Sequence, residues 1–565
     1  MINILTVSLH RLACILLVAS LLLTAASGPA AADDPESDGQ YERVQALLSA
    51  MPLEQRVGQM FMVSVSGEGL SEPVVRFLQA MTPGAIAMFS SNGTAPGPVT
   101  STINGWQAVA TQIGARIPLI IAIDHEGGPV TRFTEGFTAL PWGAALGAMP
   151  EAEAGAVGAL AAAELRAVGI NMNLAPVVDV RVPTGSGNPL FMEDRAFGAD
   201  PARVGSAAAA YVQGLQAGGV IGTLKHFPGH GSAGDSHRFL PVVTSSREAL
   251  DQIELAPFRV GIEAGAEVVM VGHLSVPALD PEPNRPASLS SRIVGDVLRG
   301  ELGFQGVVMT DAMDMRAITA HYNPATAAVM AVQAGIDLIA IGPTMSAERQ
   351  LAMKQAVLNA VARGDITEAR IEESARRILL LKARYGLLDW IPLDPATAAD
   401  RVGTAAHQES LYAIYLNTVA VGYDFVELLP LQPDAMRIGL AYPSVFPDLG
   451  RACSAIAPSV RLLTYSLDPT AADMSAIRQM AALVDVVVIF THDIAAHPRQ
   501  ALLVNGVPQI QAVVVALRSP YDFERGIAPI AYLAAFNPSP QAFRAACAVL
   551  FGQHEASGHF PLPPG

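Results

Sequence analysis

Eight short apolar runs, separated by longer alanine-rich stretches with helical periodicity, occupy residues 55–385 and narrow the folds open to this chain. Near-continuous apolar runs are typical of parallel strands covered on both faces, because neither face meets water. Eight successive strand–helix units predict a (β/α)8 barrel, with a doubly wound open sheet as the competing architecture. The runs lie at 57–65, 84–90, 119–124, 172–180, 219–227, 266–273, 306–311 and 337–342.

A second group of apolar runs follows a proline-containing segment, which we interpret as a linker over 391–404. A chain of 565 residues is too long for one ordinary domain. We therefore expect a catalytic barrel over 41–390 and a smaller, open α/β sandwich domain over 405–565. The second group of runs lies at 436–441, 460–465, 484–490, 511–517 and 530–536.

Composition argues against a nucleic-acid partner. The formal net charge is −16, whereas a nucleic-acid binder needs a basic face to meet phosphates. Hydrophobic residues make up 51% of the chain and charged residues 15%, which is enough apolar surface for large cores. Much of that apolar content is alanine in helix-like runs, so it does not by itself indicate a membrane protein.

The N-terminal segment reads as a targeting sequence. Arg11 is its only lysine or arginine, an apolar run covers 12–26, and three alanines end the segment at residue 32. That run is short for a membrane span, so we predict a signal peptide over 1–32, with an uncleaved anchor as the alternative. The expected mature protein is exported, to the periplasm or outside the cell, without stable membrane insertion.

Two of the three cysteines remain after that cleavage, Cys453 and Cys547. We interpret them as ordinary buried thiols. One disulfide is the alternative, which export would permit.

Several barrel runs end in residues that can do chemistry. The carboxyl ends of barrel strands converge on one face, so we expect their side chains to meet there. For any single position a solvated loop start is the plainer interpretation. Several together favour an active site. The residues are Asp124, Asp179, Lys225, His226, His273 and Asp311.

The densest group of such residues is the run KHFPGHG at 225–231, followed by Asp235-Ser236-His237. Its glycines and proline indicate a shaped loop. Asp235 and His237 are two positions apart, so both side chains can point the same way on an extended loop. A carboxylate beside an imidazole orients the ring and supports its protonated form. A metal site built from the histidines, or a merely polar loop, are the alternatives.

These motifs resemble glycoside hydrolase family 3, in its β-N-acetylhexosaminidase branch. KHFPGHG followed by DSH is similar to that branch's signature. The β-glucosidase branch lacks the histidine-bearing loop and takes its acid from the second domain. The resemblance extends through IDHEGGPVTRF, NPLFMEDRAFGADP, PALDPEPNRPASLS and GFQGVVMTDAMDM, and so covers nearly the whole barrel. The second domain looks like that of exported two-domain members.

The resemblance implies a role for each matching residue. Asp311 matches the nucleophile, His237 the general acid/base and Asp235 its orienting partner. Asp314 is the rival carboxylate, with a local cap or a surface charge as its expected role. The residues that match the sugar-binding subsite are Asp124, Arg132, Arg195, Lys225 and His226.

The implied chemistry suits these residue types. Retaining hydrolysis needs a carboxylate to attack the anomeric carbon and a second group to protonate the leaving oxygen. Imidazole is an unusual glycosidase acid, but histidine has a reference pKa of about 6.5, which suits proton transfer near neutral pH. No cofactor and no metal are needed.

The sequence departs from the family pattern at three points. The stretch 232–234 is one residue shorter than usual, the Asp common after GHG is missing, and Pro129 stands where Arg is usual.

We therefore expect hydrolysis of terminal β-N-acetylglucosamine from cell-wall muropeptides, chitin fragments or related glycosides. The alternatives are phosphorolysis of the same linkage, a β-glucosidase-like activity, and a sugar-binding protein that has lost catalysis.

Overall fold

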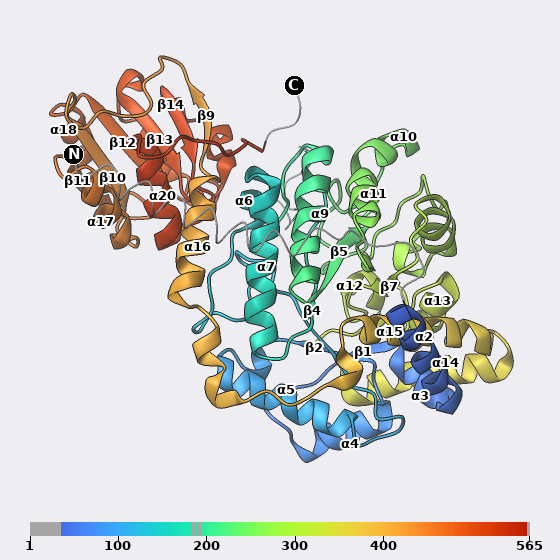
Figure 1. Cartoon of the computed structure of the whole chain (residues 1–565). Coiled ribbons are helices and arrows are strands. Elements are labelled where there is room, and N and C mark those ends of the chain that lie inside the picture. Colours follow the sequence, from blue (N-terminus) through green and yellow to red (C-terminus); the bar gives the residue numbers. More distant parts are fainter. Residues whose placement is uncertain (1–34, 183–187, 189–193, 562–565) are drawn as a thin grey trace.

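The computed structural model describes residues 35–182, 188 and 194–561, so the predicted signal peptide lies outside the described residues. The chain forms a parallel barrel and a separate mixed sheet, drawn from blue to yellow and from orange to red in Figure 1. Among the described residues, no helix combines the length and the apolar character needed to cross a membrane.

Eight parallel strands form the barrel in the order β7-β6-β5-β4-β3-β2-β1-β8. The ring is closed where the Thr310 N–H donates to the Leu338 carbonyl at 3.0 Å and Met309 bridges Leu338. The predicted (β/α)8 barrel is confirmed. Its strands are β1 (Phe61–Ser64), β2 (Ala85–Met88), β3 (Ile120–Ile123), β4 (Met172–Asn173), β5 (Ile221–Phe227), β6 (Val268–Val271), β7 (Val307–Thr310) and β8 (Ile339–Ala340).

All eight strands are buried along their whole length, which explains their near-continuous apolar sequences. The strands are shorter than the runs that predicted them, most clearly at β4. There the apolar run continues to residue 180, but Pro176 has no N–H for a ladder hydrogen bond, and only Val177 bridges Lys225 beyond the strand.

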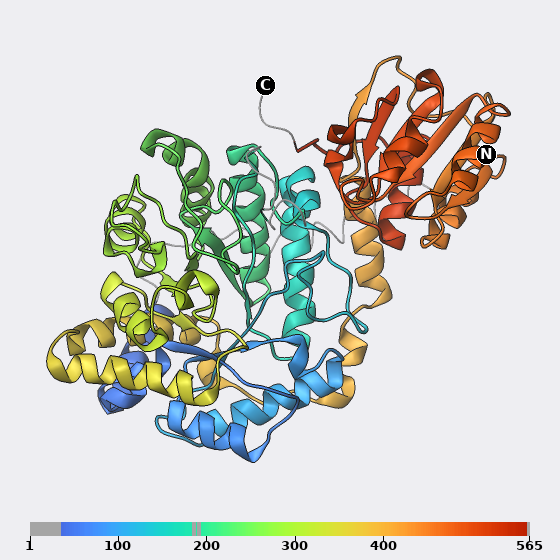
Figure 2. The same ribbon diagram turned by 180° about the vertical axis from the view of Figure 1, so that it is seen from behind.

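Helices cover the outside of the barrel (Figures 1 and 2). Helix α14 shows how the sequence sets their ends: the Ser346 hydroxyl accepts the Arg349 N–H at its start, and Gly364 ends it with a φ of 80°. The helices of this part are α2 (Pro35–Ala50), α3 (Leu53–Gln59), α4 (Glu72–Met81), α5 (Pro96–Ala110), α6 (Gly143–Ala148), α7 (Glu151–Ala167), α9 (Pro201–Ala217), α10 (Arg247–Ala249), α11 (Ala256–Glu263), α12 (Arg316–Thr319), α13 (Pro324–Ala334), α14 (Ala347–Arg363) and α15 (Glu368–Arg384), with π-helical segments η2 (Leu250–Glu254) and η4 (Arg292–Glu301).

The second sheet has six strands in the order β11-β10-β12-β13-β14-β9. The five predicted strands are present and parallel to one another. The sixth, β9, was not predicted and runs antiparallel to β14 at one edge. The elements are α16 (Ala405–Leu416), β9 (Ala420–Asp424), β10 (Ile438–Pro443), α17 (Pro447–Ile456), β11 (Arg461–Tyr465), α18 (Ala471–Ala481), β12 (Val486–Thr491), α19 (Arg499–Val504), β13 (Ala512–Ala516), η9 (Pro520–Arg525), β14 (Ala531–Ala534) and α20 (Pro540–Leu550).

Cys453 on α17 and Cys547 on α20 are joined by a disulfide, with their Cα atoms 5.0 Å apart. The interpretation of these residues as ordinary buried thiols was wrong. Both side chains are fully buried, but α17 and α20 pack against each other on one face of the sheet and bring the two sulfurs together. Sequence spacing could not show this, because the residues are 94 positions apart.

The two domains meet along one side of the barrel. Helix α16 lies beside α7 in both views (Figures 1 and 2), and His407 Nδ1 lies 2.6 Å from Glu164 Oε1. Near the C-terminus, the His559 N–H donates to the Ala148 carbonyl at the end of α6, at 2.7 Å. The second domain is thereby held against the helices that follow β3.

Candidate active site

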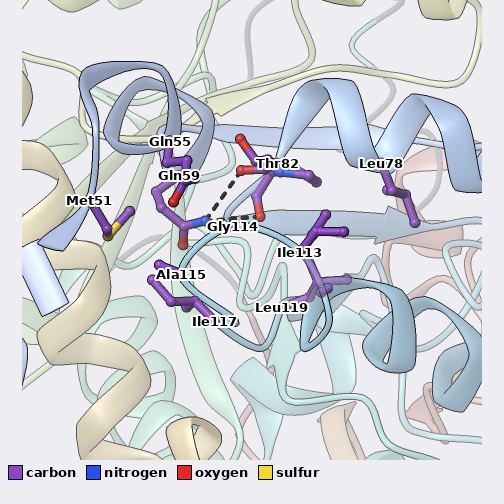
Figure 3. A pocket seen from close by; sticks show the side chains of 12 residues that line it. Met51, Gln55, Gln59, Leu78, Thr82, Ile113, Gly114, Ala115, Ile117 and Leu119 are labelled. Carbon is purple, nitrogen blue, oxygen red and sulfur yellow. Dashed lines mark hydrogen bonds between the residues drawn. The ribbon is translucent and has the colours of Figure 1, made fainter.

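Two cavities lie at opposite ends of the barrel. The one at the N-terminal ends of the strands measures about 20 Å³, room for a single water. Figure 3 shows it beside Gln59, whose side-chain amide donates to the Thr82 and Pro83 carbonyls. The cavity at the carboxyl ends measures about 680 Å³, the size of a small-ligand site. Seven of the eight predicted site residues line it: Asp124, Arg132, Arg195, Lys225, His226, His237 and Asp311.

A chain of ion pairs forms one wall of this cavity. Lys225 Nζ, at the end of β5, lies 2.9 Å from Asp124 Oδ1 and 2.6 Å from Glu126 Oε1. Arg195 binds Glu126 through two hydrogen bonds of 2.8 Å. Arg132 adds a longer pair, 3.6 Å from Asp124 Oδ2. Alternating cations and carboxylates of this kind offer donors and acceptors to the hydroxyl groups of a neutral sugar.

Glu126 is the centre of this network. Burial would raise the pKa of its carboxyl, but Arg195 and Lys225 hold that pKa well below its usual range. Burial opposes the charge on Lys225 as well, but Asp124 and Glu126 raise its pKa. Both groups therefore stay charged at neutral pH. Sequence reasoning missed Glu126, although it stands inside the DHEGG segment, two residues after Asp124.

Asp179 holds the histidine side of the cavity in place. Its carboxylate is fully buried, accepts the His230 N–H at 2.7 Å and lies 2.7 Å from His226 Nδ1. Because an ionised carboxylate can only accept, Nδ1 of His226 carries the proton and Nε2 is the nitrogen left for a ligand. The sequence predicted that Asp179 lies at a strand end, but it did not predict that this residue positions the histidines.

Asp311 follows β7 and lies on the floor of the cavity. Its backbone N–H donates to the Val271 carbonyl at 2.9 Å, and its Oδ1 accepts the Ala312 N–H at 2.7 Å. Burial would raise the pKa of this carboxyl, but His226, His273 and the Ala312 N–H lower it to about 2. Asp311 is therefore ionised at neutral pH, as a nucleophile must be.

His273 holds the backbone next to Asp311 in place. Its Nε2 lies 3.1 Å from the Ala312 carbonyl and its Nδ1 lies 2.8 Å from the Ser288 hydroxyl. A carbonyl can only accept, so Nε2 carries a proton. Burial lowers the pKa of His273, against the opposite effect of the nearby Asp311 carboxylate.

His237 lies at the rim of the cavity and pairs with Asp235; we call these two residues the dyad. Asp235 Oδ1 accepts the His237 N–H at 2.9 Å and lies 3.2 Å from His237 Nδ1. The His237 side chain is 69% exposed, whereas that of Asp235 is 22% exposed and lies behind it. Between them, the Ser236 carbonyl accepts the Ala317 N–H of α12 at 3.2 Å, which ties the loop to the segment after Asp311.

Asp314, the rival carboxylate, has a different task. Its oxygens accept the Gly342 and Thr344 N–H groups at 3.0 Å and the Thr344 hydroxyl, so it caps the turn after β8. A local cap is one of the two roles that we expected for it. Two further lining residues, Phe89 and Arg316, were not predicted, and the Arg132 guanidinium lies 5.9 Å from the Phe89 ring centre.

No group of three or more potential metal ligands occurs among the residues that the structure describes. In particular, His226 Nδ1 faces Asp179, and His230 Nε2 lies 3.2 Å from the Ser236 hydroxyl.

Carboxylates, cations and histidines that meet at the carboxyl ends of a closed parallel barrel are typical of a barrel enzyme, and the class of enzyme here is a glycoside hydrolase. The family model for the N-terminal domain of glycosyl hydrolase family 3 matches residues 52–381, and the chain belongs to this family.

Relatives and solved structures agree with this assignment. A "Beta-hexosaminidase" of Xanthomonas oryzae pv. oryzae is 37% identical over 312 residues, which are 54% of this chain and 90% of that protein. "Beta-hexosaminidase A" of Pseudoalteromonas piscicida is 32% identical over 64% of this chain and 62% of its own length.

Among solved structures, a family 3 beta-N-acetylglucosaminidase from Paenibacillus sp. str. FPU-7 matches with a TM-score of 0.78 and 34% identity, over 91% of this chain and 99% of that one. A beta-glucoside phosphorylase, BglX, has a TM-score of 0.73 over 93% of this chain and 96% of its own, but only 22% identity, and so shares the fold.

Proposed function

We propose that this protein is a retaining exo-glycosidase that hydrolyses terminal, non-reducing β-N-acetylglucosamine. One observation carries the proposal: an ionised Asp311 lies in the same cavity as the Lys225–Asp124 pair, with the His237–Asp235 dyad at its rim. The names of the Xanthomonas and Paenibacillus relatives support N-acetylhexosamine as the sugar.

In the first step, Asp311 attacks the anomeric carbon, forming a covalent glycosyl-enzyme. Its Oδ1 is held by the Ala312 N–H, so we assign the attack to Oδ2. As the glycosidic bond breaks, its electron pair goes to the leaving oxygen, which takes a proton from His237 Nε2. Asp235, beside Nδ1, supports the positive charge of the ring before that transfer.

In the second step, neutral His237 takes a proton from a water molecule, and the resulting oxygen attacks the anomeric carbon. The bond to Asp311 breaks, and the carboxylate is restored. Two inversions leave the product in the β configuration. Asp124, Arg132, Arg195, Lys225 and His226 hold the sugar throughout.

The same site suits a second acceptor, inorganic phosphate. A histidine does not repel an approaching anion as a carboxylate does, and Arg132 and Arg316 line the cavity. Phosphorolysis is therefore the alternative outcome of the same first step.

Product analysis tests the proposal. Aryl β-N-acetylglucosaminides, chitin fragments and muropeptides are incubated with and without phosphate, and the first-formed anomer is recorded by NMR. Free β-N-acetylglucosamine supports hydrolysis, and sugar-1-phosphate supports phosphorolysis. Turnover of aryl glucosides alone would indicate a β-glucosidase-like enzyme. Sugar binding without turnover would indicate a protein that has lost catalysis.

We also propose that the protein is exported and acts on glycans of the cell envelope, such as peptidoglycan fragments. The apolar segment before residue 33 supports export, and so does the disulfide, since disulfides persist in oxidising compartments. N-terminal sequencing of the protein from cell fractions should find a chain that begins near Asp33. Recovery from the cytoplasm of a chain that begins with Met1 would refute the proposal that the protein is exported.

A further inference from the structure

Asp194 joins the barrel to the second domain immediately beside the sugar site. Its side chain accepts the Ser519 hydroxyl at 3.0 Å and lies 3.4 Å from Arg518 Nε. Both partners follow β13 in the second sheet. The Asp194 side chain is 3% exposed, and its φ of 52° is one that residues other than glycine adopt at a cost. Such a conformation must be held by its surroundings.

Arg518 is itself fixed between the two domains. It pairs with Asp493, which follows β12 in its own domain. Its guanidinium also lies 4.5 Å from the ring centre of Trp142, the barrel residue that precedes α6. The arginine therefore bridges one carboxylate from each domain and packs on a barrel aromatic ring. An ion pair buried in this way is screened by water far less than a surface pair.

The backbone at Asp194 is also the start of the sugar-binding network. The next residue is Arg195, which binds Glu126 at 2.8 Å, and Glu126 in turn binds Lys225 at 2.6 Å. On the barrel side, the Ala144 N–H donates to the Asp194 carbonyl at 3.1 Å. Residues 194–195 are thus clamped between α6 and the second domain.

A second contact holds the same surfaces together. The Arg181 guanidinium lies 3.6 Å from the ring centre of Tyr521 and 3.2 Å from Glu524 Oε2, both in η9. The segment after β13 therefore docks as a unit on the loop after β4.

We propose that Arg518 and Ser519 are positioning residues of the sugar site. By holding Asp194, the second domain fixes the backbone of Arg195 and, through Glu126 and Lys225, the donors that face the sugar. The second domain is then part of the support of the active site and not an independent module. This inference rests on the proposed function.

The test compares Arg518→Gln and Ser519→Ala with a matched control, Arg437→Gln. Arg437 forms an exposed ion pair with Asp485 where β10 and β12 begin, whereas Asp493 and Arg518 follow the other ends of β12 and β13. We expect Arg518→Gln to raise KM for an aryl β-N-acetylglucosaminide about tenfold, with kcat changed less than threefold, because Arg195 binds the sugar in the ground state and the transition state alike. Ser519→Ala should raise KM about threefold and Ser519→Thr should restore it. Arg437→Gln should match the wild type.

A second measurement does not depend on turnover. Hydrogen exchange of the Ala144 amide, which donates to Asp194, should be faster in Arg518→Gln and unchanged in Arg437→Gln. If Arg518→Gln fails to fold, the Ser519→Ala and Ser519→Thr pair decides. Wild-type kinetics and wild-type exchange in both variants would overturn the inference. An inactive wild type that binds no N-acetylglucosamine would refute the proposed function, while the exchange comparison would still decide whether the second domain holds Asp194.

Discussion

Asp235 holds His237 by two contacts from one oxygen, to the backbone N–H at 2.9 Å and to Nδ1 at 3.2 Å. The carboxylate therefore fixes both the peptide that carries the imidazole and the direction of the ring. Nε2 is directed away from its partner and is the atom that exchanges protons with the substrate in the proposed mechanism.

Asp311→Ala should abolish turnover of every substrate, because no glycosyl-enzyme can form without the carboxylate. His237→Ala should lower kcat/KM far more for some substrates than for others. Natural disaccharides, whose leaving groups need a proton, should lose about 10²–10⁴-fold in kcat/KM, whereas glycosides of very acidic phenols should lose least. Steady-state and single-turnover kinetics on both substrate types measure this difference. If both types slow equally while deglycosylation is not limiting, His237 is not the acid, and a carboxylate of the second domain becomes the candidate.

Asp235→Ala should show a milder form of the His237→Ala effect, because the imidazole remains but is no longer oriented. Asp235→Asn is the matched comparison. The amide keeps the size of the side chain but not its charge, so it should retain more activity than alanine and less than the wild type. A leaving-group series measured for both variants tests this order. Equal loss on all leaving groups would assign Asp235 to the fold of the loop alone.

We predict that Glu254 makes the free energy of unfolding depend on pH. The carboxyl is fully buried at the end of η2, against Gly229 and Gly231 of the KHFPGHG segment. Burial, with a contribution from Asp179, raises its pKa to about 7 from the ordinary 4.5. Between these two pH values the folded protein binds more protons than the unfolded chain, so stability falls as pH rises from about 4.5 to about 7.

Glu254→Gln keeps a neutral side chain of the same shape and should remove this loss, which is on the order of 3 kcal/mol. In urea unfolding at pH 5, 6 and 7.5, the free energy of unfolding of the variant should increase relative to that of the wild type as pH rises. Exposed Glu248→Gln on the neighbouring α10 is the control and should not show this gain. A difference between wild type and Glu254→Gln that stays constant with pH would refute the prediction.

The Cys453–Cys547 disulfide closes a loop across most of the second domain, with a sequence separation of 94. Loops of this length lose the most unfolded-state entropy on cross-linking, so Cys453→Ala with Cys547→Ala should destabilise that domain by about 2–4 kcal/mol. Urea unfolding, followed by separate probes for each domain, measures the change. The wild type with a reducing agent should behave like the double variant, and an equal loss in the barrel would contradict a local effect.

Chelation should leave activity unchanged, because every proposed step uses protein side chains alone. Assays after prolonged EDTA treatment and gel filtration check this. Activity that is lost with EDTA and restored by zinc would revive the metal interpretation of His226, His230 and His237.

The barrel could be predicted because its strands are buried on both faces and therefore leave continuous apolar runs. Strand β9 left no such run: it is an edge strand, half-buried over Val421–Asp424, with Gly422 inside it. The predicted site residues come together because motifs at strand ends place them on one face. Glu126 and Glu254 were not predicted, because the sequence alone does not show what a carboxylate contacts. Glu126 contacts cations, whereas Glu254 is buried against a loop.

The contact between Asp194 and Ser519 joins positions 325 residues apart. A polypeptide is made from its N-terminus, so every strand of the barrel and every residue lining the sugar cavity is synthesised before Ser519. A chain cut short by a late stop codon would carry the complete set of chemical groups for catalysis without the clamp that aligns them. Maturation of this enzyme would then depend on the last stretch of its coding sequence, far from any residue that touches the sugar.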